Sequence, residues 1–153
     1  MIRPTHALRI IETTRNIKKT GSAILTSEPI DIQLWDLSGD VRFENSWLVA
    51  QRGADGVVLV YNADLKMNEE EMESWVKHFP QKMKMAPSQV LAVGYHMSGR
   101  GGVSNLEKVE KFSLEFEHFA MGENSEQFLE RFDRFVGEIV TRKAQEVGEK
   151  NEI

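Results

Sequence analysis

The sequence predicts a doubly wound α/β domain built on a mostly parallel sheet. Residues 56–62 and 90–94 are continuously apolar, which is typical of strands buried on both faces of a parallel sheet. Segments with helical periodicity alternate with these strands, as expected for such a fold. The 153 residues are enough for one domain with a hydrophobic core and too few for two comfortable ones.

Residues 7–13 and 30–36 are predicted to form an antiparallel hairpin. The first segment is rich in β-branched side chains, and the second alternates apolar and polar residues. The apolar positions of the second segment share one face, which we expect to be covered. Residues 16–22 are polar and contain a glycine, so we expect them to form the turn.

A helix is predicted between the two apolar strands, and residues 112–116 are predicted to form a third strand. Asn68 and Glu71 have the spacing of a capping box at the start of the helix, and Pro80 is expected to stop it. Its apolar side chains lie on one face. They are Met72, Trp75, Val76 and Phe79.

A second amphipathic helix is predicted to begin near Asn124 and Ser125. Its wide apolar stripe is expected to pack on the sheet, in preference to binding a partner. The stripe contains Phe128, Leu129, Phe132, Phe135, Val136, Ile139 and Val140. Because the pattern decays after Arg142, we expect a domain over residues 1–142 and a frayed polar tail over residues 143–153.

The composition excludes several classes of protein. The net charge of −5 argues against a general nucleic-acid-binding protein, which normally has a basic face. The sequence has no cysteine, which excludes disulfides and zinc–thiolate sites and leaves no residue for prenylation. No apolar run approaches the roughly 18 residues of a membrane span. If the protein reaches a membrane, we expect a partner to bring it there.

The residues from Asp36 to Gly39 form an Asp-x-x-Gly motif at the end of a predicted strand. Ligands of these folds bind at the carboxyl edge of the sheet, where the carboxylate can hold Mg²⁺ through water. The glycine lets a backbone N–H approach a terminal phosphate without a side chain in the way. The motif alone is too common to identify a protein, so its surroundings decide its meaning.

The surrounding residues resemble the Rab family of small GTPases. Residues 35–43 (Trp-Asp-Leu-Ser-Gly-Asp-Val-Arg-Phe) match the Rab switch II. Residues 52–61 (Arg-Gly-Ala-Asp-Gly-Val-Val-Leu-Val-Tyr) resemble the segment that leads into the next strand, at the family's spacing. Within the family, the chain is most similar to the divergent Rab-like GTPase of the intraflagellar transport B complex. The residues that carry this similarity are 4–10, 32–36, 55–58, 62–64 and 71–75.

The resemblance implies a site for GTP and Mg²⁺. Thr5 takes the place of the switch I threonine, which engages Mg²⁺ and the terminal phosphate, while Asp36 and Gly39 take the places of the motif's metal and phosphate contacts. Tyr95 and His96 stand where the family has its base-recognition motif, so the resemblance places them at the nucleotide. No carboxylate is placed to read the guanine edge, and we expect weak guanine specificity. Alternatively, Thr5 is a terminal residue without a role, and His96 is an ordinary loop residue.

The sequence departs from the Rab pattern at two points. Asp40 follows Gly39, where active Rabs carry the glutamine that orients the attacking water. A carboxylate cannot donate as an amide does and would repel the γ-phosphate, so we expect a weak GTPase at most. The sequence also contains no Gly-x-x-x-x-Gly-Lys-Ser/Thr P-loop. In the family, the P-loop, first strand and first helix lie upstream of this chain's first residue. We expect either a sequence that begins late or a lineage that lost nucleotide binding.

Two functions compete for this sequence. The favoured one is an adaptor that docks on coiled-coil subunits of the intraflagellar transport B complex, which the resemblance implies are intraflagellar transport proteins seventy-four and eighty-one. The alternative is a slow nucleotide-switched GTPase, which requires an upstream P-loop. With either function, the resemblance places the protein in the cytoplasm, in the cilium or flagellum, and in its basal body. An unrelated flavodoxin-type or receiver-type domain is disfavoured, because no acidic pocket with a phosphorylatable aspartate follows a first strand.

Overall fold

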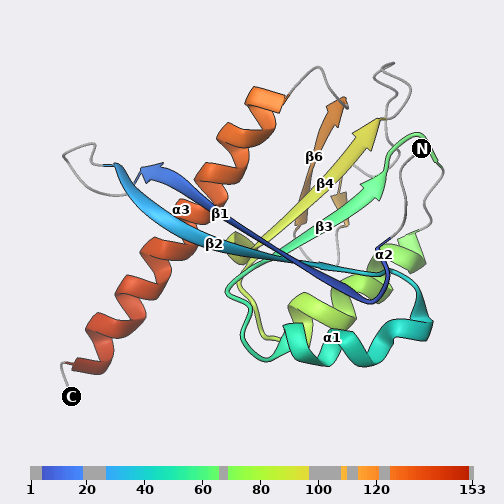
Figure 1. Ribbon diagram of the computed structural model, residues 1–153, viewed down its shortest axis with the longest axis horizontal. Helices are drawn as coiled ribbons and strands as arrows, with labels where there is room; N and C mark the ends of the chain where they lie inside the picture. The colour runs from blue at the N-terminus through green and yellow to red at the C-terminus, as the bar shows by residue number, and fades with distance from the viewer. Residues whose placement is uncertain are drawn as a thin grey trace. The chain divides into compact units, whose positions relative to one another are not determined.

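The computed structural model of the protein divides into two compact units, Met1–Ala54 and Asp55–Ile153, which we call the N-terminal and C-terminal units (Figure 1). The residues that the structure describes are 5–18, 27–65, 69–96, 108–109, 114–120 and 125–151.

The N-terminal unit is built on a two-stranded antiparallel hairpin. Strand β1 (Leu8–Lys18) pairs with strand β2 (Ser27–Leu37) along their whole length, with Leu8 opposite Leu37 and Lys18 opposite Ser27. The predicted hairpin is therefore confirmed. Its turn begins later than predicted, because residues 16–18 continue the ladder, and residues 19–26 lie outside the described part of the chain.

The two faces of the hairpin differ, as the alternation in the sequence predicts. On β2, Ile30, Ile32 and Leu34 are half-buried, and the residues between them are exposed. The exposed face carries polar pairs across the strands, including Thr14 Oγ1 donating to Asp31 Oδ1 over 2.7 Å. Such cross-strand pairs each contribute on the order of 0.2–1 kcal/mol and help to fix the register.

A short helical segment follows the hairpin. The 3₁₀ turn η1 (Val41–Phe43) runs directly into helix α1 (Glu44–Gln51). The buried indole of Trp47 anchors this helix, because its Nε1 donates to the carbonyl oxygen of Ser38 over 2.9 Å. The helix is thereby tied to the loop that carries the Asp-x-x-Gly motif.

The C-terminal unit contains a four-stranded sheet in the order β3-β4-β6-β5. Strands β3 (Val57–Asn62), β4 (Val90–His96) and β6 (Leu114–Ala120) are parallel neighbours, whereas β5 (Lys108–Val109) pairs antiparallel with β6. The prediction of a mostly parallel sheet is confirmed. The two-residue strand β5 was not predicted, since so short a segment has no periodicity to detect.

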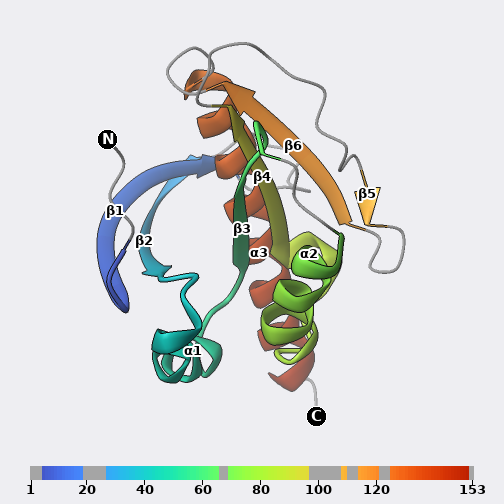
Figure 2. The same ribbon diagram turned by 90° about the vertical axis from the view of Figure 1, so that its right-hand side faces the viewer.

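Helices cover the two faces of this sheet (Figure 2). Helix α2 (Glu69–Val76) packs on one face, and helix α3 (Ser125–Asn151) packs on the other. The core on the α2 side contains Leu59, Tyr61, Met72, Val76, Val90 and Ala92. On the α3 side, an added Cβ at Gly56 would lie 2.5 Å from Ile139 Cδ1, so the helix passes close to the backbone where β3 begins.

The apolar strands β3 and β4 are buried to different extents. All of β4 except Tyr95 is buried, which confirms the prediction for that strand. On β3, however, Val60 is 64% exposed and Val58 is only half-buried, so the prediction of burial on both faces is wrong there. The strand order explains the difference, because β3 is the edge of its sheet and β4 lies between two neighbours.

Both predicted helix ends differ in the structure. Pro80 does not stop its helix at once, because Lys77–Gln81 form a π-helical turn, η2, that contains it. Proline has no N–H to donate and clashes with the carbonyl four residues earlier, so a wider turn accommodates it.

Helix α3 remains helical through Asn151, where a frayed tail was expected after Arg142. An Arg142–Glu146 ion pair of 3.0 Å at i,i+4 spacing supports this extension. The expected cap Asn68 lies outside the described residues, and the domain division at residue 142 stays a prediction.

The π-helical turn ends in a Schellman motif. Lys84 has a φ of 55°, its N–H donates to the Gln81 carbonyl, and the Met85 N–H donates to the Pro80 carbonyl. This is the usual C-terminal cap with lysine at the position that favours glycine. Another 3₁₀ turn, η3 (Pro87–Gln89), then leads into β4.

Candidate functional site

The predicted metal residues Thr5 and Asp36 lie together in the N-terminal unit. Thr5 Oγ1 donates to Asp36 Oδ2 over 2.7 Å, although 31 positions separate the two residues. Arg9 also reaches this oxygen, with its guanidinium NH2 2.8 Å from Asp36 Oδ2. The pairing of the strands explains the arrangement, because Arg9 and Asp36 are register partners and Thr5 stands just before β1.

A strained residue holds the Thr5 segment against the Asp-x-x-Gly loop. Ala7 has a φ of 58°, which L-residues rarely adopt because of the clash with Cβ. Its carbonyl accepts a hydrogen bond from the Ser38 N–H over 2.9 Å and another from Ser46 Oγ over 3.3 Å. Such conformations persist only where surrounding contacts impose them, and they concentrate at functional sites. Next to the buried Ser38, Gly39 is exposed, which leaves its backbone accessible to a ligand.

Asp40, which the resemblance places at the position of the catalytic glutamine, is fully engaged by Arg42. The Arg42 backbone N–H donates to Asp40 Oδ1 over 2.9 Å, which caps the η1 turn. Arg42 Nε lies 3.0 Å and 2.9 Å from the two carboxylate oxygens, and its NH2 completes a forked pair. The side-chain hydrogen bond from Arg42, followed by the backbone hydrogen bond, lowers the pKa of Asp40 to about 2. The pKa of Arg42 is raised by the same side-chain contact.

These residues have the chemistry of part of a magnesium site. Mg²⁺ prefers hard oxygen ligands and often uses only one or two protein groups, with water and phosphate oxygens completing an octahedron. The Thr5 hydroxyl and the Asp36 carboxylate fit this description. Within the described ranges, no three His, Cys, Asp or Glu side chains converge on a common point. Any metal bound here would therefore take most of its ligands from water or phosphate oxygens.

The predicted nucleotide residues Tyr95 and His96 lie in the C-terminal unit, at the carboxyl end of β4. His96 is 3% exposed, and its Nδ1 lies 3.0 Å from Asp64 Oδ1. The Tyr95 carbonyl accepts a hydrogen bond from the Ala63 N–H over 2.9 Å. Asp64 belongs to the turn after β3, where its N–H donates to Asn62 Oδ1. His96 therefore joins the strand end to this turn, and Tyr95, half-buried, is the more accessible of the two.

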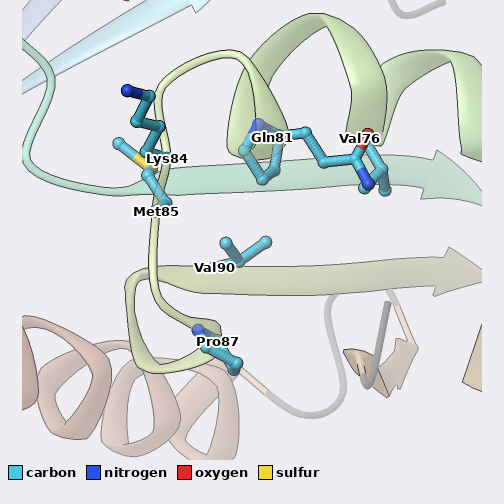
Figure 3. A pocket seen from close by; sticks show the side chains of 7 residues that line it. Val76, Gln81, Lys84, Met85, Pro87 and Val90 are labelled. Atoms are coloured by element: carbon cyan, nitrogen blue, oxygen red, sulfur yellow. The ribbon is translucent and has the colours of Figure 1, made fainter. Parts of the chain in front are cut away.

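A small pocket of about 100 Å³ lies beside the amino end of β4, opposite the end that carries Tyr95 and His96 (Figure 3). It is formed where the Schellman motif meets the beginning of β4, with Lys84, Met85 and Val90 on its walls. Val90 is the first residue of β4, whereas Tyr95 and His96 are the last two. This pocket is therefore separate from the predicted nucleotide residues, and nothing in its lining suggests catalysis.

The structure adds three residues to which the sequence analysis gave no role: Arg9, Ala7 and Arg42. Arg9 could have been found by counting the hairpin register back from Asp36, but the position of the turn was not known accurately enough. Arg42 stands two residues after Asp40, a spacing that a 3₁₀ turn brings together. Ala7 has no sequence signal, because alanine does not usually mark a positive φ.

No helix in the described part of the chain combines the length and hydropathy of a membrane-spanning segment.

Comparisons with known proteins identify the family. The model of the Ras family matches residues 7–110. An intraflagellar transport protein 22 homolog of Danio rerio is 27% identical over 152 residues, covering 98% of this chain and 79% of the relative. The Rattus norvegicus homolog is 31% identical over 149 residues, covering 93% and 76%. The intraflagellar transport protein 22 of Chlamydomonas reinhardtii is 25% identical over 99 residues, covering 65% and 47%. The chain therefore belongs to the Ras family, in the Rab-like branch formed by the intraflagellar transport protein 22 homologues.

Proposed function

We propose that this protein is an adaptor subunit of the intraflagellar transport B complex, where it docks on the coiled-coil intraflagellar transport proteins seventy-four and eighty-one. In this role it serves the assembly of cilia or flagella, and it is found in the cytoplasm, the cilium or flagellum and the basal body. The relatives named for intraflagellar transport support the process. The observation that carries the adaptor role is the pairing of Asp40 with Arg42.

Asp40 stands where a Ras-family enzyme positions water, and Arg42 occupies both of its carboxylate oxygens. A carboxylate held in this way has no donor to offer a water molecule and little free acceptor capacity. Its charge is already balanced, so we expect repulsion of a γ-phosphate to be smaller than for a lone aspartate. The loop therefore keeps a fixed shape but lacks the group that drives hydrolysis. This combination supports recognition by surface over catalysis.

Co-purification tests the adaptor proposal. The tagged chain is co-expressed with the two coiled-coil subunits, and a 1:1:1 complex is expected to survive gel filtration. Asp36→Asn, which removes the charge of the metal ligand, is expected to leave the complex intact if docking depends on the surface alone. Complete failure of the wild-type chain to co-purify with either subunit would contradict the proposal.

A second candidate function is a slow GTPase, and the contact between Thr5 and Asp36 favours it. These residues have the chemistry of a Mg²⁺ site at which Gly39 would meet a terminal phosphate. The family as a whole binds GTP with Mg²⁺. The test is single-turnover GTP hydrolysis by a form of the protein that carries a phosphate-binding loop upstream.

In that assay Asp40→Gln is expected to accelerate hydrolysis, because it restores an amide that can orient water. Asp40→Asn is the matched control, since it removes the same charge with a side chain one methylene shorter. The water-positioning argument requires Gln to exceed Asn. Equal rates for the two variants would mean that only the charge mattered.

A further inference from the structure

We infer that Arg9 is a tethered counter-ion of Asp36, which competes with divalent cations for its carboxylate and so lowers the affinity of this site for metal. The inference rests on the proposal that Thr5 and Asp36 are the metal residues. Arg9 thereby helps to set the affinity of this site for a divalent metal ion.

The geometry brings both donors to one oxygen. Thr5 Oγ1 and Arg9 NH2 lie 2.7 Å and 2.8 Å from Asp36 Oδ2. A metal ion held at that oxygen, directly or through a water molecule, needs the lone pairs that these donors now use. Thr5 can change from donor to ligand by rotating its hydroxyl, because a hydroxyl oxygen has lone pairs of its own. Arg9 has no lone pair to offer, so it must move away.

The hairpin makes the contact of Arg9 persistent. Arg9 and Asp36 are direct partners in the register, so the strands themselves keep the two side chains close. The guanidinium end is nevertheless free to leave, since the Arg9 side chain is 64% exposed. Exposed ion pairs of this kind contribute little to folding stability. The pair can therefore open when a stronger cation arrives, without unfolding the hairpin.

The electrostatics oppose simultaneous occupancy. A divalent cation on Asp36 would stand within a few ångströms of a guanidinium fixed to the neighbouring strand, and like charges at that range repel. Metal binding must either displace Arg9 into water or accept the repulsion. Both reduce the affinity of the wild-type site. Replacing Arg9 by a neutral residue should therefore raise the affinity for the metal.

The experiment is a titration of the full chain with Mn²⁺ alone, with free Mn²⁺ measured by electron paramagnetic resonance. Arg9→Gln is expected to bind Mn²⁺ roughly fivefold more tightly than the wild type, the factor expected from losing one exposed charge contact. Arg9→Lys keeps the charge and is expected to stay near the wild-type affinity. Asp36→Asn is expected to abolish the binding in either background.

Arg15→Gln is the matched control for net charge. Arg15 lies on the same strand, six residues from Arg9, which corresponds to about 20 Å along an extended chain. This exceeds the Debye length of about 8–10 Å, so the substitution should leave Mn²⁺ affinity unchanged. An equal gain from Arg15→Gln would show a general effect of charge and would overturn the inference.

Two other results would also overturn it. One is an unchanged or weaker affinity in Arg9→Gln while circular dichroism shows a folded protein. The other is the absence of any Mn²⁺ binding that depends on Asp36, which would remove the metal site itself. Neither result changes the expected co-purification with the coiled-coil subunits, so the adaptor proposal is tested independently of this inference.

Discussion

Gly94 provides a direct test of the packing beside the predicted base-binding residues. It lies on β4 opposite Tyr61 of β3, immediately before Tyr95 and His96. A Cβ added at Gly94 would stand 2.8 Å from both Cζ and the hydroxyl oxygen of Tyr61, and 3.2 Å from the Ala63 Cβ. Real Cβ atoms essentially never approach this closely, so Gly94→Ala must move a buried aromatic ring or the strand.

The magnitude follows from two opposing effects. Overpacking a well-packed core costs about 1–3 kcal/mol. Replacing glycine where φ is not positive returns about 0.4–1 kcal/mol, because it restricts the unfolded chain. The Tyr61 ring is 5% exposed and forms part of the core with α2, so it has little room to yield. We expect a net loss of about 1–2 kcal/mol in the free energy of unfolding, or roughly 2–8 °C in Tm.

The assay is urea and thermal unfolding followed by circular dichroism, with Gly53→Ala as the control. Nothing lies within 4 Å of a Cβ at Gly53, so that variant should equal the wild type or exceed it by about 0.5 kcal/mol. In the background Tyr61→Phe, which removes one of the two 2.8 Å contacts, the loss caused by Gly94→Ala should shrink. The reasoning is refuted if Gly94→Ala and Gly53→Ala have the same stability.

Three further predictions concern the cap, the acidic loop and the buried indole. Lys84→Gly is expected to raise the free energy of unfolding by about 0.5–1 kcal/mol because it removes a strained φ. Lys82→Gly is the control and should lower it, because Lys82 follows η2 with the backbone dihedrals of a right-handed helix. The Arg42 hydrogen bond lowers the pKa of Asp40 from 3.8 to about 2. The contribution of the Asp40–Arg42 pair to the free energy of unfolding is therefore present above about pH 4 and lost towards pH 2. The difference in urea midpoint between wild type and Asp40→Asn should therefore vanish over that window. Trp47→Phe should cost about 1–3 kcal/mol in chemical unfolding, because it leaves a loop carbonyl without its indole donor.

The sequence was sufficient to place Asp36, and the resemblance named Thr5 with it, but neither identified Arg9 as a neighbour. Alternation predicted that residues 30–36 form a strand, and the motif placed Asp36 at its end. The contact with Arg9 depends on register, and a shift of one residue would have put that arginine on the other face. Register is set by the turn, and the polar residues Asn16 and Lys18 suggested a turn where the structure continues the strand around the buried Ile17. Local composition and long-range pairing conflicted there, and pairing prevailed.

Strands β3 and β4 show a second limit of sequence analysis. Both are continuous apolar runs, and nothing in their composition distinguishes an edge strand from a central one. The 64% exposure of Val60 follows from the strand order β3-β4-β6-β5, which depends on the whole unit. The amphipathic helices were easier to predict, since the face of α2 that carries Met72 and Val76 is determined by the helix's own periodicity.

The two carboxylates of the Asp-x-x-Gly loop lead to the same view of function. Asp36 and Asp40 are each paired with an arginine of the same unit, Arg9 and Arg42 respectively. A ligand can shift a conformational equilibrium only by the difference in its affinity for the two states. Where protein cations already neutralise both acidic groups, a bound metal has less to add, and the loop holds its shape without one. Under our adaptor proposal, breaking either pair should therefore alter the loop but leave co-purification with the coiled-coil subunits unchanged.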